Sequence, residues 1–247
     1  MEEKFKFPTE QIELPSKGLP YSPDSELSKG VIEMKYMSAK EEDILTNTNF
    51  LKNGTVIDKL LQSMIVTPVT YDELLVCDKN ALLVAARILG YGKDYEFEYD
   101  GQKITFDLST VDPLPLSEDL KPGKNEFDFH LPRAKATVTF KLLTHGDEKK
   151  IDREIQGLKK VNPQGSFDQT TRLKHIIVAI NGDRDTSNIR EFVDNILVSD
   201  LRELRKYIVK VTPELNLKFD YTRDNGDVVE GVNLPIGLSF LWPDSGL

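Results

Sequence analysis

Three histidines are the residues of this sequence best suited to metal binding or acid–base chemistry. His130, His145 and His175 lie far apart in the chain and lack the short spacing of zinc-ligand motifs. A histidine-centred site would require the fold to bring them together. We therefore interpret them as ordinary surface or core residues.

The single cysteine, Cys77, follows the apolar residues Leu74, Leu75 and Val76. A lone cysteine excludes an internal disulfide and a cysteine-rich zinc site. Its apolar surroundings are typical of a small buried side chain rather than a reactive thiol.

The segment 181–185 (NGDRD) resembles half of a calcium loop. It lacks the full ladder of oxygen ligands and the glutamate that closes an EF-hand. The alternative is a turn between two helices, in which Asp185, Thr186 or Ser187 caps the second helix. We favour the turn.

Carboxylates are numerous, but their pattern is structural. In the segment 147–154 acidic and basic residues alternate, as on a solvated helix face. Asp78 and Asp200 precede apolar helical patterns, which predicts that they act as helix caps. The sequence also contains no phosphate-binding loop, dinucleotide fingerprint, nucleophile elbow or paired-histidine helix. We therefore predict no catalytic residue, no cofactor and no metal ligand, and expect that the chain is not an enzyme.

Composition limits the partners. The chain has 247 residues, 39% of them hydrophobic, and a formal net charge of −9. This charge gives no general attraction to nucleic acid or anionic lipid. No apolar run approaches the roughly 18 residues of a membrane span, and the N-terminus lacks a signal-peptide pattern. We expect a protein that folds in the cytoplasm and binds neither nucleic acid nor membrane.

The pattern of elements predicts an α+β fold. Prolines and glycines break any helix in residues 1–37, which read as an extended arm ending in a short strand at 31–36. Whether this arm covers its own core or a neighbour stays open. Ser38 with Glu41 forms a capping box, and Thr55 with Asp58 repeats the pattern. Helical spacing follows at 56–65 and 82–89, with glycines at 90 and 92 as the stop.

Hairpins are the second component. Alternating residues flank Asp100-Gly101, a strong signal for a type I′ turn, and a second hairpin spans 217–232. Between the hairpins we predict a linker at 109–126, a strand at 136–143 and helices at 147–160, 172–180 and 188–211. The resulting organisation is an arm at 1–37, a helical region with the first hairpin at 38–110, a linker and extended segment at 111–135, and a second α+β half at 136–247.

Two stretches of the chain resemble each other. The run 74–78 (LLVCD) aligns with 196–200 (ILVSD), and without gaps Phe97 and Tyr99 align with Phe219 and Tyr221. We infer two helix-plus-hairpin units, related by duplication and a pseudo-twofold, although chance similarity is the alternative. Duplication of a packing unit suits a scaffold better than a catalyst.

Several short motifs, taken in this order, resemble the T-even-type phage baseplate hub and hub-assembly protein family. They are 14–21 (LPSKGLPY), 33–45 (EMKYMSAKEEDIL), 51–61 (LKNGTVIDKLL), 78–80 (DKN), 87–92 (RILGYG) and 240–243 (FLWP). Relatives of this kind often carry a Cys-x-x-Cys in the first hairpin, where this chain reads 98–103 (EYDGQK). The resemblance therefore implies a protein of the central baseplate, but no zinc site.

Three functions follow as hypotheses. The first is a structural hub subunit retained in the virion, which would bind other baseplate proteins through the N-terminal arm, the hairpins and the C-terminal tail. Its expected contact residues are Leu14, Leu19, Tyr21, Phe240, Leu241 and Trp242, and homo-oligomerisation stays open. The second is an assembly chaperone that leaves before maturation. The third is a cell-wall hydrolase, which no motif supports.

Overall fold

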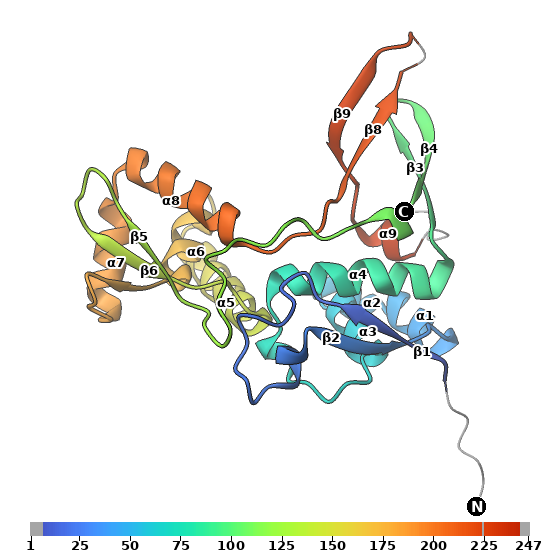
Figure 1. Ribbon diagram of the computed structural model, residues 1–247, viewed down its shortest axis with the longest axis horizontal. Helices are drawn as coiled ribbons and strands as arrows, with labels where there is room; N and C mark the ends of the chain where they lie inside the picture. The colour runs from blue at the N-terminus through green and yellow to red at the C-terminus, as the bar shows by residue number, and fades with distance from the viewer. Residues whose placement is uncertain (1–6, 224, 243–247) are drawn as a thin grey trace, which may run out of the picture.

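The computed structural model describes residues 7–223 and 225–242 and has an α+β fold of helices and small antiparallel sheets, as predicted. Two units lie at opposite ends of the longest axis of the molecule, and an arm of two hairpins projects from one of them (Figure 1). Buried side chains from both units belong to one hydrophobic core.

The first unit begins with a hairpin and continues into helices. Its elements are β1 (Thr9–Glu13), the 3₁₀ turn η1 (Glu26–Lys29), β2 (Val31–Lys35), α1 (Ala39–Leu45), α2 (Thr48–Lys52), α3 (Val56–Met64), the 3₁₀ turn η2 (Tyr71–Glu73) and α4 (Val76–Tyr91). α3 buries one apolar face, with Leu60, Leu61 and Met64 fully inside. This buried face explains why apolar residues recur at helical spacing in 56–65.

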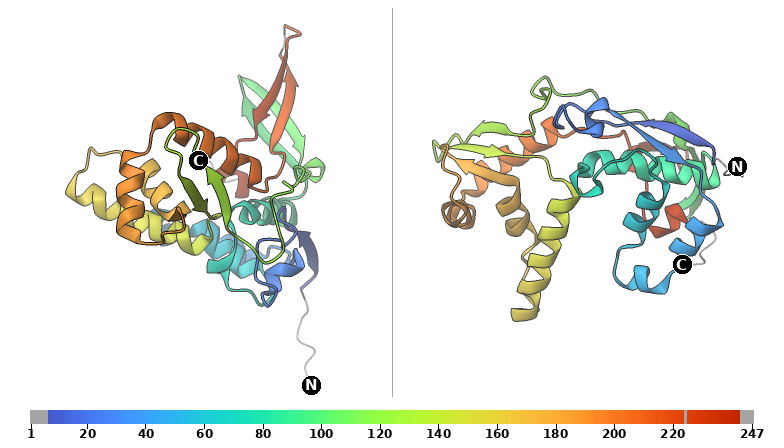
Figure 2. Two further views of the ribbon diagram at one scale, coloured as in Figure 1. Left: turned by 60° about the vertical axis from the view of Figure 1, so that its left-hand side comes forward. Right: turned by 90° about the horizontal axis from the view of Figure 1, so that it is seen from below.

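The second unit combines a three-stranded sheet with helices. Its elements are β5 (Phe127–His130), β6 (Thr137–Phe140), α5 (His145–Val161), α6 (Asp168–Ile176), β7 (Ile177–Ile180), α7 (Thr186–Asn195) and α8 (Val198–Val211). The strand order is β5-β6-β7, and both pairings are antiparallel. In the view from below, α5 and the helices α1–α3 extend to the same side of the strands (Figure 2).

The arm is formed by elements from both halves of the chain. The first hairpin, β3 (Asp94–Tyr99) and β4 (Gln102–Asp107), follows α4 and leads to the 3₁₀ turn η3 (Leu108–Thr110). The second, β8 (Lys218–Thr222) and β9 (Val228–Asn233), follows α8 and leads to α9 (Leu238–Leu241). Asp100 and Gly101 have φ values of 53° and 75°, which confirms the predicted type I′ turn.

Two helix predictions were wrong in part. The segment 172–180 is helical only to Ile176, because Ile177–Ile180 pairs with β6 as strand β7. The helix predicted at 188–211 is two helices, separated by extended backbone at Ile196 and Leu197. At Ile177–Ile180 the pairing with a distant strand overrides the local helical pattern.

The N-terminal segment covers its own core from Phe7 onward. β1 pairs with β2 in register from Thr9↔Lys35 to Glu13↔Val31, which confirms the strand predicted at the end of this segment. Leu14, Tyr21 and Leu27 are buried. The segment is therefore part of the first unit, which resolves the question that the sequence left open.

The first evidence for a duplicated architecture is the passage from strand to helix. In the first unit Lys35 binds Glu41, which forms a capping box with Ser38 at the start of α1. In the second, Lys141 binds Asp147, which forms a capping box with Thr144 at the start of α5. Both carboxylates are buried. The same spacing of cation, cap and carboxylate therefore begins the helical part of each unit.

The strand pairing is repeated as well. Met34 of β2 forms an antiparallel bridge with Ile65, which directly follows α3. Phe140 of β6 pairs with Ile177, which directly follows α6. In each unit, the residue that directly follows a helix thus pairs with the second strand of that unit's first hairpin.

Candidate functional site

Asp78 and Asp200 are not the helix caps that we predicted. α4 begins at Val76 and α8 at Val198, so each aspartate is the third helical residue, and both are fully buried. Asp78 accepts hydrogen bonds from Ser16 N (2.9 Å), Ser16 Oγ (2.6 Å) and Tyr21 Oη (2.7 Å). Burial raises the pKa of Asp78, and the bonds from Ser16 and Tyr21 oppose that effect.

Asp200 repeats this arrangement with backbone donors. Its carboxylate accepts from the amides of Arg133 (3.1 Å) and Ala134 (2.8 Å). Those residues follow Leu131-Pro132, just as Ser16 follows Leu14-Pro15. Each aspartate therefore holds a Leu-Pro loop against the start of a helix. The Leu-Pro pair alone does not mark these loops in the sequence, because it occurs five times in the chain.

The three histidines lie on different elements and have different surroundings. His130 is exposed on β5, and His175 contacts Glu154 Oε2 at 2.9 Å through Nε2. His145 is buried at the junction of the two units, where its ring packs edge-on against Tyr71 with centroids 4.7 Å apart. Burial lowers the pKa of His145. Within residues 7–223 and 225–242 no group of His, Cys, Asp and Glu is arranged to hold a metal ion.

Charged groups surround His145 and join the two units. Lys149 of α5 lies 2.9 Å from Asp72, and Lys79 of α4 lies 2.8 Å from Asp58 in its own unit and 3.9 Å from Glu148 of α5. The Tyr71 hydroxyl also donates to Asp58 at 3.0 Å. This network of paired charges fixes the position of α5 against η2. Its groups are engaged with one another rather than directed into an open pocket.

The segment 181–185 is a helix-entry turn. Asp185 accepts from the amides of Ser187 and Asn188 as the N-cap of α7, as predicted, but the turn follows strand β7 and not a helix. Cys77 is buried, and burial raises the pKa of its thiol. These two features therefore belong to the fold. None of the described helices is long and apolar enough to cross a membrane.

Most of the predicted contact residues lie inside this chain. Leu14, Tyr21, Phe240 and Leu241 are buried, and their side chains stabilise the chain's own core. Side chains packed there cannot simultaneously contact a neighbour, which corrects our expectation for these four residues. Leu19 and Trp242 are half-buried and pack against the core from its edge.

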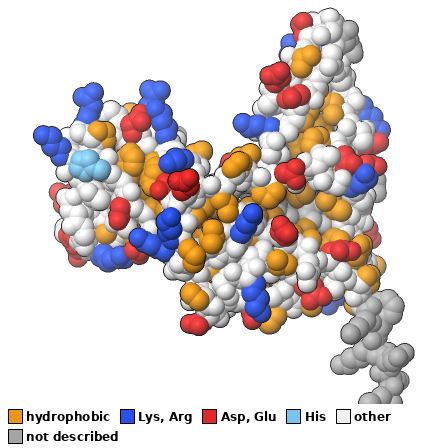
Figure 3. Space-filling view, viewed as in Figure 1, with side chains coloured by type: hydrophobic (Ala, Val, Ile, Leu, Met, Phe, Trp, Pro, Cys, Tyr) orange, Lys and Arg blue, Asp and Glu red, His pale blue; other side chains and the backbone are white. Residues whose placement is uncertain are grey.

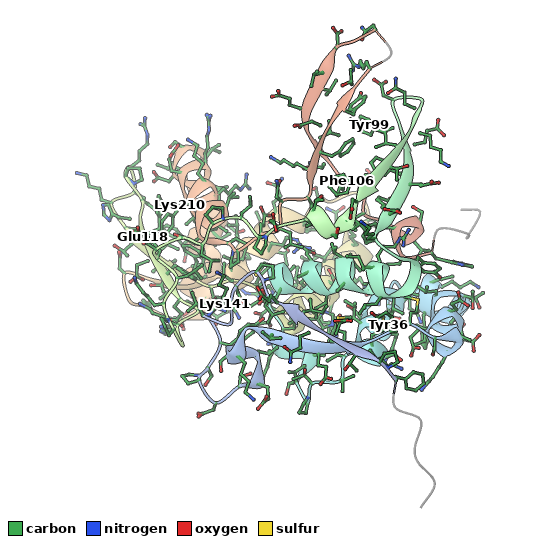
Figure 4. The ribbon with its side chains drawn as sticks, turned by 45° about the vertical axis from the view of Figure 1, so that its right-hand side comes forward. Tyr36, Tyr99, Phe106, Glu118, Lys141 and Lys210 are labelled. Carbon is green, nitrogen blue, oxygen red and sulfur yellow. The ribbon has the colours of Figure 1, made fainter. Side chains whose placement is uncertain are left out.

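The arm is a better candidate for a protein-binding surface. Its hairpins face each other through aromatic side chains: Phe219 lies 5.2 Å from Phe97, 5.8 Å from Tyr99 and 6.4 Å from Phe106 between ring centroids. Tyr99 and Phe106 point into the space between the hairpins (Figure 4). Near the tip, Tyr221 Oη donates to Asp100 at 2.8 Å. The two hairpins therefore form a single body.

The arm also has open strand edges and exposed apolar side chains. Each hairpin is a two-stranded sheet, so among the described residues its outer edges pair with no further strand. Tyr99 is 36% exposed and Val228 is 62% exposed, and Phe97, Ile104 and Phe106 are only half-buried. Hydrophobic side chains gather along the arm and at its base (Figure 3). Open strand edges beside exposed apolar groups are typical of surfaces that bind other proteins.

A surface hollow lies at the base of the arm. It is lined by the half-buried or exposed residues Leu114, Leu215, Leu217 and Ile236, with Asn80 of α4 at one side. Polar and charged residues complete the lining: Glu214, Asn216, Lys218 and Asn233. The hollow therefore combines apolar and polar surface.

Scans against protein-family models, curated proteins and solved structures each found no match to this chain.

Proposed function

We propose that this chain is a non-enzymatic component of a contractile phage tail baseplate, placed in the central hub region and acting through protein–protein contacts. The sequence motifs that resemble the T-even-type hub family support the location. The projecting arm supports the mode of action. In this proposal the protein is made in the host cytoplasm and incorporated into the virion.

The observation that carries the proposal is the paired-hairpin arm with open strand edges. Unpaired backbone groups beside apolar side chains form a template for an additional strand, and strand addition is a common mode of protein recognition. The first hairpin's outward residues Glu96 and Lys103 are paired with each other, so the ribbon keeps its shape without a partner. A neighbour that pairs with an edge would cover the half-buried aromatic side chains as well.

The test uses particles from cells that produce this chain. Quantitative mass spectrometry of gradient-purified virions and of tail intermediates locates the protein. Presence in both supports a hub subunit. Presence in intermediates alone supports the alternative, an assembly chaperone that leaves before maturation. Absence from both refutes the proposal.

A matched pair of variants tests the arm itself. Val228→Asn alters an exposed apolar residue on the arm, and Val161→Asn makes the same change at a residue that is 87% exposed on α5. We expect the first to reduce recovery of the protein with tail intermediates and the second to leave it unchanged. Equal recovery of both variants would show that this part of the arm does not carry the contact.

A further inference from the structure

The two units of this chain are joined through two different surfaces. Leu74 and Leu75 directly precede α4, and Val76 is its first residue. We call Leu74–Val76 the helix-entry segment. It pairs with Leu143–His145, the strand-exit segment between β6 and α5. His145 N donates to Leu74 O at 2.8 Å, Val76 N donates to Leu143 O at 3.0 Å, and Leu75 forms an antiparallel bridge with Thr144.

Because the architecture is duplicated, each unit has both surfaces. The helix-entry segment of the second unit is Ile196–Val198, and the strand-exit segment of the first unit is Met37–Ala39. The backbone of the two helix-entry segments is alike: Leu75 has φ −64° and ψ 142°, and Leu197 has φ −64° and ψ 133°. The second helix-entry segment is therefore preformed for the same pairing. In the strand-exit segments Ser38 (φ −124°, ψ 174°) and Thr144 (φ −90°, ψ 166°) are both extended.

In the described part of the chain, neither of these second copies pairs with another backbone segment. Among the described residues, the Val198 amide and Ile196 carbonyl make no hydrogen bond, and neither do the Ala39 amide and Met37 carbonyl. Leu75 is 1% exposed, whereas its equivalent Leu197 is 50% exposed and Val198 is 81% exposed. The contact that buries one helix-entry segment is missing at the other.

The two free segments lie on opposite sides of the molecule. α1 begins at one end of the longest axis, and α8 begins at the other (Figure 1). Tyr36, next to the free strand-exit segment, lies near the end of the β1–β2 hairpin in the first unit (Figure 4). The segments are thus too far apart to pair within one chain, but two chains can bring them together.

Charge favours a second copy as the occupant. Arg202, Arg205 and Lys206 line a shallow exposed depression on α8 with Val198 and Val209. Lys and Arg side chains are prominent over the second unit (Figure 3). Beside the free strand-exit segment lie acidic groups.

Those acidic groups come from two elements. Glu42 and Asp43 are exposed on α1, and Glu10 of β1 accepts a hydrogen bond of 3.0 Å from Tyr36 Oη. Lys40 is exposed beside them, and in the depression Lys206 pairs with Glu203 at 2.8 Å, so the complementary charges are Arg202 and Arg205 against Glu42 and Asp43. Opposite charges of this kind orient two partners and disfavour the reverse pairing.

We propose that a second copy of this chain docks its Met37–Ala39 segment on Ile196–Val198 of the first, which repeats between chains the contact that joins the units within one chain. The interface is heterologous, because each copy contributes a different surface. Each added copy leaves one free segment at either end, so the assembly closes into a ring or continues as a filament. The proposal does not depend on the location in a baseplate.

Proline variants test the two free amides. Ala39 and Val198 are the first residues of α1 and α8, a position where proline fits a helix and removes only an unused amide. Thr186→Pro is the matched control at the first residue of α7. Sedimentation velocity of the purified full chain should show that the wild type and Thr186→Pro associate into species larger than the monomer as concentration rises. Ala39→Pro and Val198→Pro should remain monomers.

Mixing the two defective variants tests the head-to-tail geometry. Ala39→Pro keeps a working helix-entry segment and Val198→Pro keeps a working strand-exit segment, so an equimolar mixture should form a dimer that grows no further. Circular dichroism checks that each variant folds. Arg202→Glu, at an exposed side chain, provides a variant without backbone change and should weaken association of the whole chain.

Three results would overturn the proposal. They are a wild-type chain that stays monomeric at every concentration, single proline variants that associate as the wild type does, and a mixture of the two proline variants that remains monomeric. Because the assay uses pure protein, its outcome is separate from whether the chain occurs in virions.

Discussion

Asp78 and Asp200 occupy the same position, the third residue of α4 and of α8, and both hold a Leu-Pro loop by hydrogen bonds to a buried carboxylate. This equivalence extends a short sequence similarity into a repeated architecture. The donors differ, because Asp78 receives two hydroxyl groups and an amide whereas Asp200 receives two amides.

Removal of these carboxylates should destabilise the chain to different extents. Asp78→Ala leaves three buried donors unpaired, and we expect the free energy of unfolding to fall by about 3 kcal/mol or more. Asp200→Ala should cost about 1–3 kcal/mol. Urea unfolding measures both. The exposed Asp152 provides the control, since Asp152→Ala should change stability by less than about 0.5 kcal/mol. Equal effects at all three positions would contradict the assigned role.

Glu41 should make the fold sensitive to acid. Its burial opposes ionisation, but hydrogen bonds from Lys35, Ser38 and Ser63 prevail and hold the pKa of Glu41 at about 2. The unfolded chain has a higher glutamate pKa, about 4.3, so it binds a proton first as pH falls. The stability from this group is therefore complete above about pH 5 and is lost towards pH 2.

Glu41→Gln removes this proton linkage. The variant should be less stable than the wild type at neutral pH, and its free energy of unfolding should fall less steeply between about pH 5 and pH 2. Urea unfolding at a series of pH values measures the slope. Glu42→Gln changes the exposed neighbour and should keep the wild-type slope. An unchanged slope in Glu41→Gln would refute the assignment.

The hairpins of the arm should be coupled through Phe97 and Phe219. Their rings meet edge-to-face, with centroids 5.2 Å apart and an angle of 79° between planes. A double-mutant cycle with Phe97→Leu and Phe219→Leu should give a coupling of about 0.5–1.5 kcal/mol. The same cycle with Phe140→Leu, a residue of the second unit's sheet, should be additive within about 0.5 kcal/mol. Additivity of the arm pair would mean that the hairpins are not joined through these rings.

Two glycines should respond oppositely to alanine. Gly101 has φ 75° in the turn of the first hairpin, so Gly101→Ala should destabilise the chain by about 1–2 kcal/mol. Gly157 lies inside α5, and an added Cβ there would have no neighbour within 4 Å. Gly157→Ala should therefore stabilise the chain by about 0.5–1 kcal/mol. Thermal unfolding of both variants checks the opposite signs.

The elements that the sequence predicted correctly depend on neighbouring residues. The capping box of Ser38 and Glu41, the turn at Asp100-Gly101 and the cap at Asp185 each require contacts across only a few residues. The same holds for both hairpins, in which each strand pairs with the next one along the chain. The similarity of 74–78 and 196–200 was also visible, because it is a property of the residue order itself.

The tertiary structure alone decided which surfaces are buried. The sequence could not show that Leu14 and Phe240 face the chain's own core, or that Ile177–Ile180 joins β6 as a strand. It also could not show that Leu75 is covered while its equivalent Leu197 is exposed. Duplicated residues have the same local preferences, so only their long-range neighbours make them different. Those neighbours are set by how distant segments pack, which no local pattern encodes.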